Sequence, residues 1–182
     1  MKIIAGRFKG RVIQMPKGIR PTSDKVREAF FEIVKGRIEG ADFLDLYCGS
    51  GAVGIEALSR GAKSITFVDN DFRCIAALKK NLAQLDILGL STINIYKKEA
   101  LKALEAFKGL SRSFDIVFLD PPYHRGMAIN TLIAFSNYDI LARDVIIAIE
   151  IYKKEDLPEE VGSIKRFRAS QYGDTRLEFF KK

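Results

Sequence analysis

The stretch Asp45-Leu-Tyr-Cys-Gly-Ser-Gly-Ala-Val-Gly54 decides the fold that this sequence predicts. It closes a strand expected at 43–47 and leads into a helix expected at 52–59. Glycines at such a turn let the backbone approach a ligand, and the helix start offers unpaired N–H groups. Twenty residues after Gly49 a second apolar run ends in Asp69, whose carboxylate can accept both hydroxyls of a ribose. The pattern therefore predicts a nucleotide-type site at the end of the first strand.

Strand and helix patterns alternate from residue 42 onwards. Further apolar runs predict strands at 64–68, 92–96, 114–120 and 145–152, and helical periodicity predicts helices at 71–85, 100–107 and 126–136. This alternation predicts an α/β fold with a parallel sheet covered by helices on both faces. A final pair of segments, 164–169 and 176–180, predicts a hairpin that adds an antiparallel edge.

The first 20 residues stand apart from this pattern. Segments 2–5 and 11–15 predict a small basic β-hairpin, followed by a linker that reaches residue 20, so we expect one unit at 1–20 and a main domain at 21–182. The main domain should open with a helix capped by Thr22 or Ser23. This capped helix start, with Arg27, could contact a ligand carboxylate, or it could be ordinary helix capping.

The composition excludes several classes of protein. The chain has 182 residues, of which 47% are hydrophobic, which is typical of a globular domain. No apolar run approaches the ~20 residues of a membrane span, and no signal-peptide pattern is present. The two cysteines, Cys48 and Cys74, fall in different predicted elements, and the chain has one histidine, so no zinc-site spacing occurs. We expect a reduced, cytoplasmic protein without a membrane partner.

The net charge of +7 is concentrated at the two ends of the chain. Residues 1–20 contain six bases and no acid, whereas the middle of the chain is mildly acidic. Aromatic residues, among them Phe8 and Phe167, interleave with the terminal bases. This distribution predicts a nucleic-acid surface around a neutral core, although solubilising termini are the alternative. The predicted RNA-binding residues are Arg7, Lys9, Arg11 and Arg20.

A second decisive stretch, Phe114-Asp-Ile-Val-Phe-Leu-Asp-Pro-Pro-Tyr123, ends the fourth core strand. Proline fixes its own φ and lacks an N–H, so the Pro-Pro pair ends the strand and makes a stiff turn. That turn presents the Asp120 carboxylate, the Pro121 carbonyl and the Tyr123 ring. Rigid loops at strand ends are where functional sites tend to lie, and a plain surface turn is the alternative.

Two features favour S-adenosylmethionine over a dinucleotide as the cofactor. Asp45 lies inside the strand, where a carboxylate suits a cationic or amino-bearing ligand better than a pyrophosphate. The Asp-Pro-Pro-Tyr turn has no purpose in hydride transfer. Glu99 is placed to approach the adenine, or it is an exposed charge at a helix start. The predicted cofactor residues are Asp45, Tyr47, Cys48, Gly49, Gly51, Asp69, Asn70, Glu99 and Ala100. The methyl donor is already activated, so no metal is expected.

Five blocks together resemble the bacterial RsmD family of class I S-adenosylmethionine-dependent methyltransferases. They are Ile3-Ile-Ala-Gly-Arg-Phe-Lys-Gly-Arg11, Arg20-Pro-Thr-Ser-Asp-Lys-Val-Arg-Glu-Ala29, Asp45 to Ala62, Asp120-Pro-Pro-Tyr123 and Tyr172-Gly-Asp-Thr175. The resemblance implies a Rossmann-like, mostly parallel seven-stranded sheet with an antiparallel edge strand. It also implies methylation of N2 of a guanine in small-subunit ribosomal RNA. The sequence leaves open whether this RNA is naked or in the assembled subunit, and we expect a monomer by default.

By the same resemblance, the target base binds at Asp120, Pro121, Pro122 and Tyr123. The exocyclic amine of guanine is a poor nucleophile, because its lone pair is conjugated into the ring. The Asp120 carboxylate and the Pro121 carbonyl could accept hydrogen bonds from its two N–H groups and direct the lone pair at the methyl group. Tyr123 would stack on a base turned out of the helix, whereas His124 is more simply an exposed loop residue.

Three alternatives to this function stay open at the level of sequence. The Asp-Pro-Pro-Tyr motif does not choose its base, so an adenine-N6 methyltransferase acting on RNA or DNA would also fit. A catalytically inactive RNA-binding assembly protein on the same fold is a second alternative, and an NAD-dependent oxidoreductase is a third.

Overall fold

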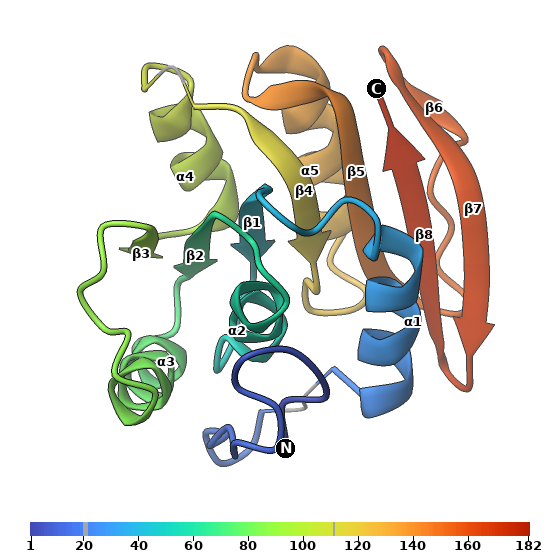
Figure 1. Cartoon of the computed structure of the whole chain (residues 1–182). Coiled ribbons are helices and arrows are strands. Elements are labelled where there is room, and N and C mark those ends of the chain that lie inside the picture. The colour runs from blue at the N-terminus through green and yellow to red at the C-terminus, as the bar shows by residue number, and fades with distance from the viewer. Residues whose placement is uncertain (20–21, 111) are drawn as a thin grey trace.

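The structure of the chain, a computed structural model, describes residues 1–19, 22–110 and 112–182. Within these ranges eight strands form one sheet in the order β3-β2-β1-β4-β5-β8-β7-β6 (Figure 1). The strands are β1 (Asp42–Leu46), β2 (Ser64–Asp69), β3 (Ile93–Lys97), β4 (Phe114–Leu119), β5 (Leu141–Tyr152), β6 (Glu160–Val161), β7 (Ile164–Tyr172) and β8 (Thr175–Lys181). The helices are α1 (Asp24–Val34), α2 (Ala52–Ser59), α3 (Phe72–Gln84), α4 (Ala100–Phe107) and α5 (Met127–Asn137).

The predicted mixture of strand directions is confirmed. Strands β1 to β5 pair in parallel, and β8, β7 and β6 extend the sheet by antiparallel pairing. The sheet has one strand more than the seven expected, because the two residues of β6 pair with the start of β7. A strand of two residues is too short to show an apolar alternation, so no sequence pattern predicts it.

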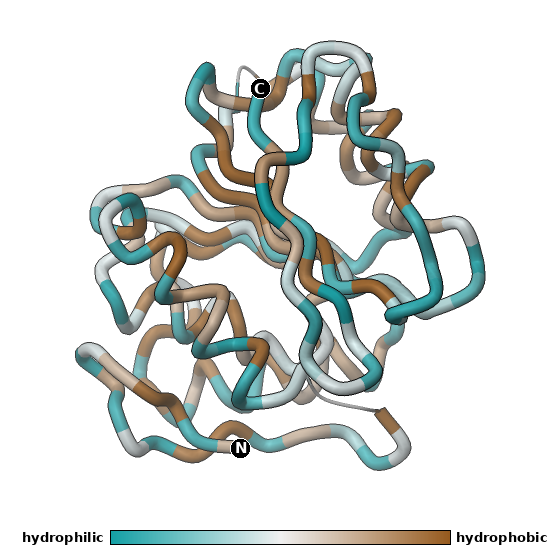
Figure 2. The backbone as a smooth tube through the Cα atoms, turned by 90° about the vertical axis from the view of Figure 1, so that its right-hand side faces the viewer, coloured by the Kyte–Doolittle hydropathy of each residue, from teal (hydrophilic) through white to brown (hydrophobic). Residues whose placement is uncertain are grey.

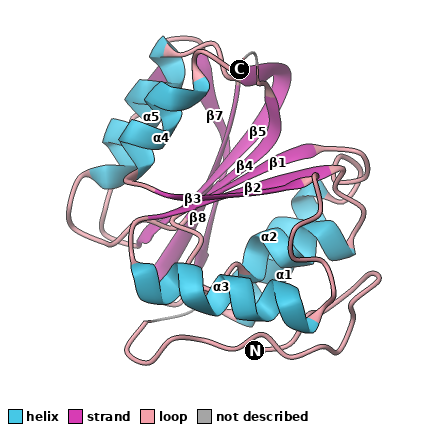
Figure 3. Cartoon of the chain, turned by 90° about the vertical axis from the view of Figure 1, so that its left-hand side faces the viewer, coloured by secondary structure: helices cyan, strands magenta, loops and turns pink. Residues whose placement is uncertain are grey.

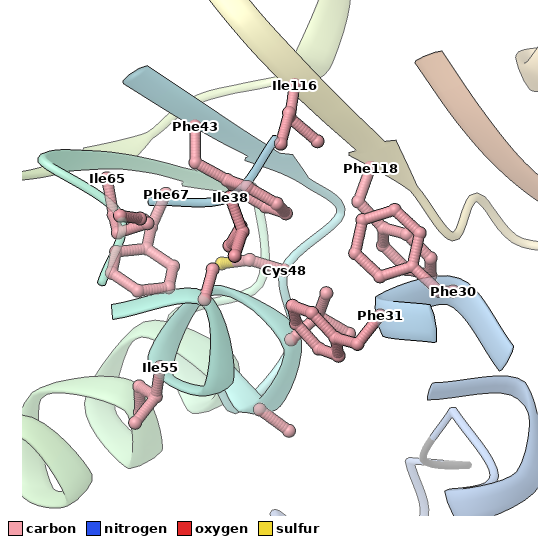
Figure 4. Packing of buried hydrophobic residues seen from close by; sticks show 14 of the residues in the cluster. Phe30, Phe31, Ile38, Phe43, Cys48, Ile55, Ile65, Phe67, Ile116 and Phe118 are labelled. Atoms are coloured by element: carbon pink, nitrogen blue, oxygen red, sulfur yellow. The ribbon is translucent and has the colours of Figure 1, made fainter. Parts of the chain in front are cut away.

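The sheet is covered on both faces by helices. Helices α1, α2 and α3 lie on one face, and α4 and α5 lie on the other (Figure 3). Hydrophobic residues run along the central strands, and hydrophilic residues predominate in the outer loops (Figure 2). On the first face, the ring of Phe30 in α1 lies 4.9 Å from that of Phe118 in β4 (Figure 4). No helix among the described residues is long and apolar enough to cross a membrane.

The strand register brings three carboxylates into one row near the carboxyl ends of the central strands. Leu46 of β1 pairs with Val68 of β2 and with Leu119 of β4, and Leu119 in turn pairs with Ile149 of β5. The residues that follow these partners are Asp69, Asp120 and Glu150. Strand order reverses beside β1, and ligands of open α/β sheets bind outside the carboxyl ends of the strands at such a point.

The N-terminal segment folds back on itself as the predicted hairpin does, but its paired part is short and contains no regular strand. Lys2 and Val12 form an antiparallel bridge, flanked by backbone hydrogen bonds from Ile3 to Arg11 at 3.0 Å and from Ile13 to Met1 at 2.8 Å. Beyond this pairing, the N–H groups of Ile4 and Ala5 donate to the buried Glu56 carboxylate of α2, at 2.8 and 3.0 Å, which fixes the segment on that helix.

The same segment packs on the helices that cover the first face. Ile3 and Ile13 are buried in the hydrophobic cluster that also contains residues of α1, α2 and α3. The expected boundary between 1–20 and 21–182 falls on Arg20 and Pro21, which lie outside the described residues, as does the predicted RNA contact of Arg20.

Candidate active site

A cavity of about 460 Å³ opens at the carboxyl edge of β1, β2, β4 and β5. It gathers most of the residues that the sequence predicted for the cofactor and for the target base. Its lining includes Met15, Thr22, Asp45, Tyr47, Cys48, Gly49, Asp69, Asn70, Asp120, Pro121, Pro122, Tyr123 and Glu150. The glycine loop and the Asp-Pro-Pro-Tyr turn, which are about 70 residues apart in the chain, therefore share one cavity.

Two carboxylates hold the glycine loop in place. Asp45, buried in β1, accepts a hydrogen bond from the N–H of Gly54 in α2 at 2.9 Å. Asp69 accepts from the N–H of Gly49 with one oxygen and from the N–H of Asp71 with the other, both at 2.8 Å. The loop is thus shaped by the acids predicted to bind the cofactor.

Gly49 and Gly51 serve different purposes. Gly49 lines the cavity with a φ of 54°, and a Cβ added there would meet no protein atom within 4 Å. That space is open to a ligand. Gly51 has a φ of 79°, and a Cβ there would lie 2.3 Å from Cδ1 of Leu78. Gly51 is not among the lining residues, so its requirement for glycine comes from packing against α3 and from backbone conformation.

The cavity is strongly acidic. Asp45, Asp69, Asp71, Asp120 and Glu150 line it, against Arg73 as the one basic residue among the described lining residues, and Arg73 forms an ion pair with Asp71. Burial raises the pKa of Asp45 to about 8; the N–H of Gly54 opposes this shift, and the nearby Asp120 and Asp69 add to it. A cationic ligand would relieve the repulsion between these carboxylates.

The Asp120-Pro-Pro-Tyr123 turn is fixed from two sides. Thr22, just before α1, donates from Oγ1 to Oδ2 of Asp120 at 2.9 Å. The Tyr123 hydroxyl donates to Oε1 of Glu150 at 3.2 Å and lies 3.0 Å from Oγ1 of Thr175. Elements distant in sequence thus orient both the carboxylate and the aromatic ring that were predicted to hold the base.

The start of α1 is capped as predicted, but Arg27 does not have the predicted position. Ser23 is the N-cap of α1 and accepts from the N–H of Val26. Arg27 does not face the cavity, because its buried guanidinium donates to the carbonyl of Lys2 at 2.8 Å and to Asp24 at 2.9 Å. The interpretation of Arg27 as a partner for a ligand carboxylate is therefore wrong.

Some predicted residues lie outside the cavity lining. The Glu99 carboxylate pairs with Lys102 at 2.9 Å on the surface, and Ala100 is buried at the start of α4, so their contact with adenine stays a prediction. Arg7, Lys9 and Arg11 are exposed on the N-terminal segment. His124 is exposed, and its ring packs against that of Tyr152 at 4.9 Å.

Sequence reasoning missed Glu150 and the contact made by Thr175. Glu150 is 3% exposed in the apolar strand β5, and Thr175 opens β8. A lone acid near the carboxyl end of an apolar parallel strand was the available signal. Cys48 is buried, and burial raises the pKa of its thiol, which fits the predicted packing role.

Comparison with known proteins now adds to this geometry. A family model described as "Conserved hypothetical protein 95" matches residues 1–181. Ribosomal RNA small subunit methyltransferase D of Escherichia coli (strain K12) is 37% identical over 160 residues, covering 87% of this chain and 78% of that protein. The chain belongs to the RsmD family. The resemblance seen in the sequence is thereby confirmed.

Other members of the RsmD family and solved structures agree with this assignment. The Haemophilus influenzae ribosomal RNA small subunit methyltransferase D is 32% identical over 166 residues, covering 86% of this chain and 81% of that protein. The solved structure of yhhF from Escherichia coli matches with a TM-score of 0.85 and 32% identity, over 100% of this chain and 97% of that one. The predicted Rossmann-like methyltransferase fold is confirmed.

Proposed function

We propose that this protein transfers a methyl group from S-adenosylmethionine to N2 of a guanine in small-subunit ribosomal RNA. One observation carries the proposal: the Asp120-Pro-Pro-Tyr123 turn and the glycine loop with Asp69 line the same acidic cavity. The name that its relatives bear, ribosomal RNA small subunit methyltransferase D, supports the choice of acceptor.

The lining residues fit S-adenosylmethionine. When bound, this cofactor supplies a methyl group on a positively charged sulfur. Asp69 stands at the end of β2, where a carboxylate can accept ribose hydroxyls. The open space beside Gly49 would take the part of the ligand nearest the loop, and the surrounding carboxylates favour its positive charges. Glu99 and Ala100 are proposed for the adenine end.

The Asp120-Pro-Pro-Tyr123 turn would act on the guanine amine by holding two hydrogen-bond acceptors in fixed positions. The Asp120 carboxylate and the Pro121 carbonyl each accept a hydrogen bond from one N–H of the amine. This favours a more tetrahedral nitrogen with its lone pair directed at the methyl group. Thr22 restricts the Asp120 carboxylate to one orientation, so little reorganisation is needed during the reaction. Tyr123 supplies a ring for stacking on the extruded base. The released proton passes to Asp120 or to solvent.

The N-terminal segment is the proposed RNA surface. Its exposed side chains Arg7, Lys9 and Arg11 carry positive charge, and Met15 from the same segment lines the cavity. Phosphate contacts at this segment would position the RNA while the target base enters the cavity. We further propose that the protein acts as a monomer in the cytoplasm, on naked ribosomal RNA or on the assembled small subunit.

A methyl-transfer assay with three acceptors tests this function. Labelled S-adenosylmethionine is supplied with unmodified ribosomal RNA, with small subunits lacking the modification, and with duplex DNA. Label in ribosomal RNA or in the subunits, with none in DNA, is the expected result. Label only in DNA, or in none of the acceptors, would overturn the proposal.

A further inference from the structure

Glu150 is a carboxylate buried in the wall of the proposed base site. It is 3% exposed, lies in the same row of the sheet as Asp120, and lines the same cavity as Pro121 and Tyr123. Burying a carboxylate is costly unless donors compensate it. Its oxygen Oε1 meets two hydroxyl groups, those of Tyr123 at 3.2 Å and Thr175 at 3.5 Å.

A neutral amide could accept from these two hydroxyls as well as a carboxylate does. A carboxylate differs in offering acceptors alone, on both of its oxygens. Glu150 therefore gives this wall of the cavity a preference for a ligand edge that presents hydrogen-bond donors.

The two purines differ at that edge. The Watson–Crick edge of guanine presents N1–H next to the N2 amine, so it offers adjacent donors. Adenine presents a bare N1 acceptor next to its N6 amine, and a carboxylate facing this acceptor is repulsive. If Asp120 and Pro121 hold the reacting amine, a second carboxylate on the neighbouring strand is placed to meet the next position along the edge.

We propose that Glu150 is the residue that selects guanine, by accepting a hydrogen bond from N1–H of the target base. Tyr123 and Thr175 hold its carboxylate in the cavity wall through Oε1. This inference rests on the proposed function, because it assigns the base preference that the Asp-Pro-Pro-Tyr turn leaves undetermined.

The test replaces the target guanine in the RNA with 2-aminopurine, which keeps the amine at C2 but lacks N1–H. Single-turnover methylation rates are compared for the two RNAs at saturating S-adenosylmethionine, with the wild type and with Glu150→Gln. The amide still accepts from Tyr123 but can donate to the bare N1. We expect the wild type to prefer guanine by about 10- to 100-fold, as for loss of a hydrogen bond to a charged group. In Glu150→Gln that preference should shrink at least tenfold.

The control is Thr22→Val, which removes a hydrogen bond to Asp120 and leaves the contacts of Glu150 intact, so it should slow both RNAs while keeping the preference for guanine. Equal slowing of both RNAs by Glu150→Gln would assign Glu150 a structural role and overturn the inference. So would a wild type that methylates both RNAs equally, a result that does not depend on whether the variant folds. A wild type that methylates no ribosomal RNA would instead overturn the proposed function, and the inference with it.

Discussion

Replacing Thr22 with valine tests whether the orientation of the Asp120 carboxylate limits catalysis. Thr22 is 9% exposed, and its Oγ1 lies 2.9 Å from Oδ2 of Asp120. Valine keeps nearly the same shape but cannot donate. A hydrogen bond to a charged group contributes about 1.5–3 kcal/mol, so its full loss in the transition state would slow transfer about 10- to 100-fold.

The expected loss falls on kcat and spares cofactor affinity. Thr22 contacts Asp120, whereas the loop acids Asp45 and Asp69 are held by backbone N–H groups that this change leaves alone. Steady-state kinetics on ribosomal RNA, with calorimetric titration of S-adenosylmethionine, measures both quantities.

The neighbouring Ser23→Ala is the matched control. Ser23 caps α1 without facing Asp120, so its loss should cost about 1 kcal/mol of stability and leave kcat unchanged. An unchanged kcat in Thr22→Val, or a loss confined to cofactor affinity, would refute the role given to the Thr22–Asp120 hydrogen bond.

Three more sets of substitutions probe the site and the RNA surface. Asp120→Ala should abolish transfer while S-adenosylmethionine still binds in a titration. Asp45→Asn should change how stability depends on pH. The folded-state pKa of Asp45, about 8, lies above the ordinary 3.8, so the wild type loses stability as pH rises from about 4 to about 8, by up to ~1.4 kcal/mol per pH unit. The variant should not show this loss. Arg7, Lys9 and Arg11 changed together to Ala should weaken RNA binding and reduce the slope of log affinity against log salt by about 0.7–0.9 for each phosphate that the variant no longer neutralises.

Each of these three predictions would be contradicted by a specific result. Loss of cofactor binding in Asp120→Ala would move this residue from the base site to the cofactor site. Parallel pH profiles for wild type and Asp45→Asn in urea unfolding would show that Asp45 does not stay protonated. For the RNA surface, Lys102→Ala in α4 together with Lys108→Ala at the C-cap of α4 serves as the control, because this helix lies on the other face of the sheet. A salt slope reduced as much by that pair would remove the special role of the N-terminal segment.

The features that the sequence predicted correctly are those encoded locally. The apolar run before Asp120, the two prolines and the glycines after β1 each determine their own strand end or turn. Parallel pairing then brings the carboxyl ends of the strands together without any further information. This is why the sequence predicts that Asp45, Gly49, Asp69 and Asp120 lie near one another, and the structure places them around one cavity.

The features that were missed depend on contacts between distant segments. The N-terminal hairpin is shorter than predicted, and its attachment to α2 through the Glu56 carboxylate joins residues more than 50 positions apart. The contacts of Glu150 and Thr175 with Tyr123 require the register of β5 against β8, which no local pattern fixes. The contact of Glu99 with adenine stays a prediction, since its carboxylate pairs with Lys102 at the surface.

Identification of the methylated nucleoside is the decisive experiment for methylation at guanine N2. Ribosomal RNA methylated by the purified protein is digested to nucleosides and analysed by mass spectrometry beside authentic standards. We expect N2-methylguanosine, and its loss when Asp120 is changed to Ala. N6-methyladenosine as the product would contradict the proposed function.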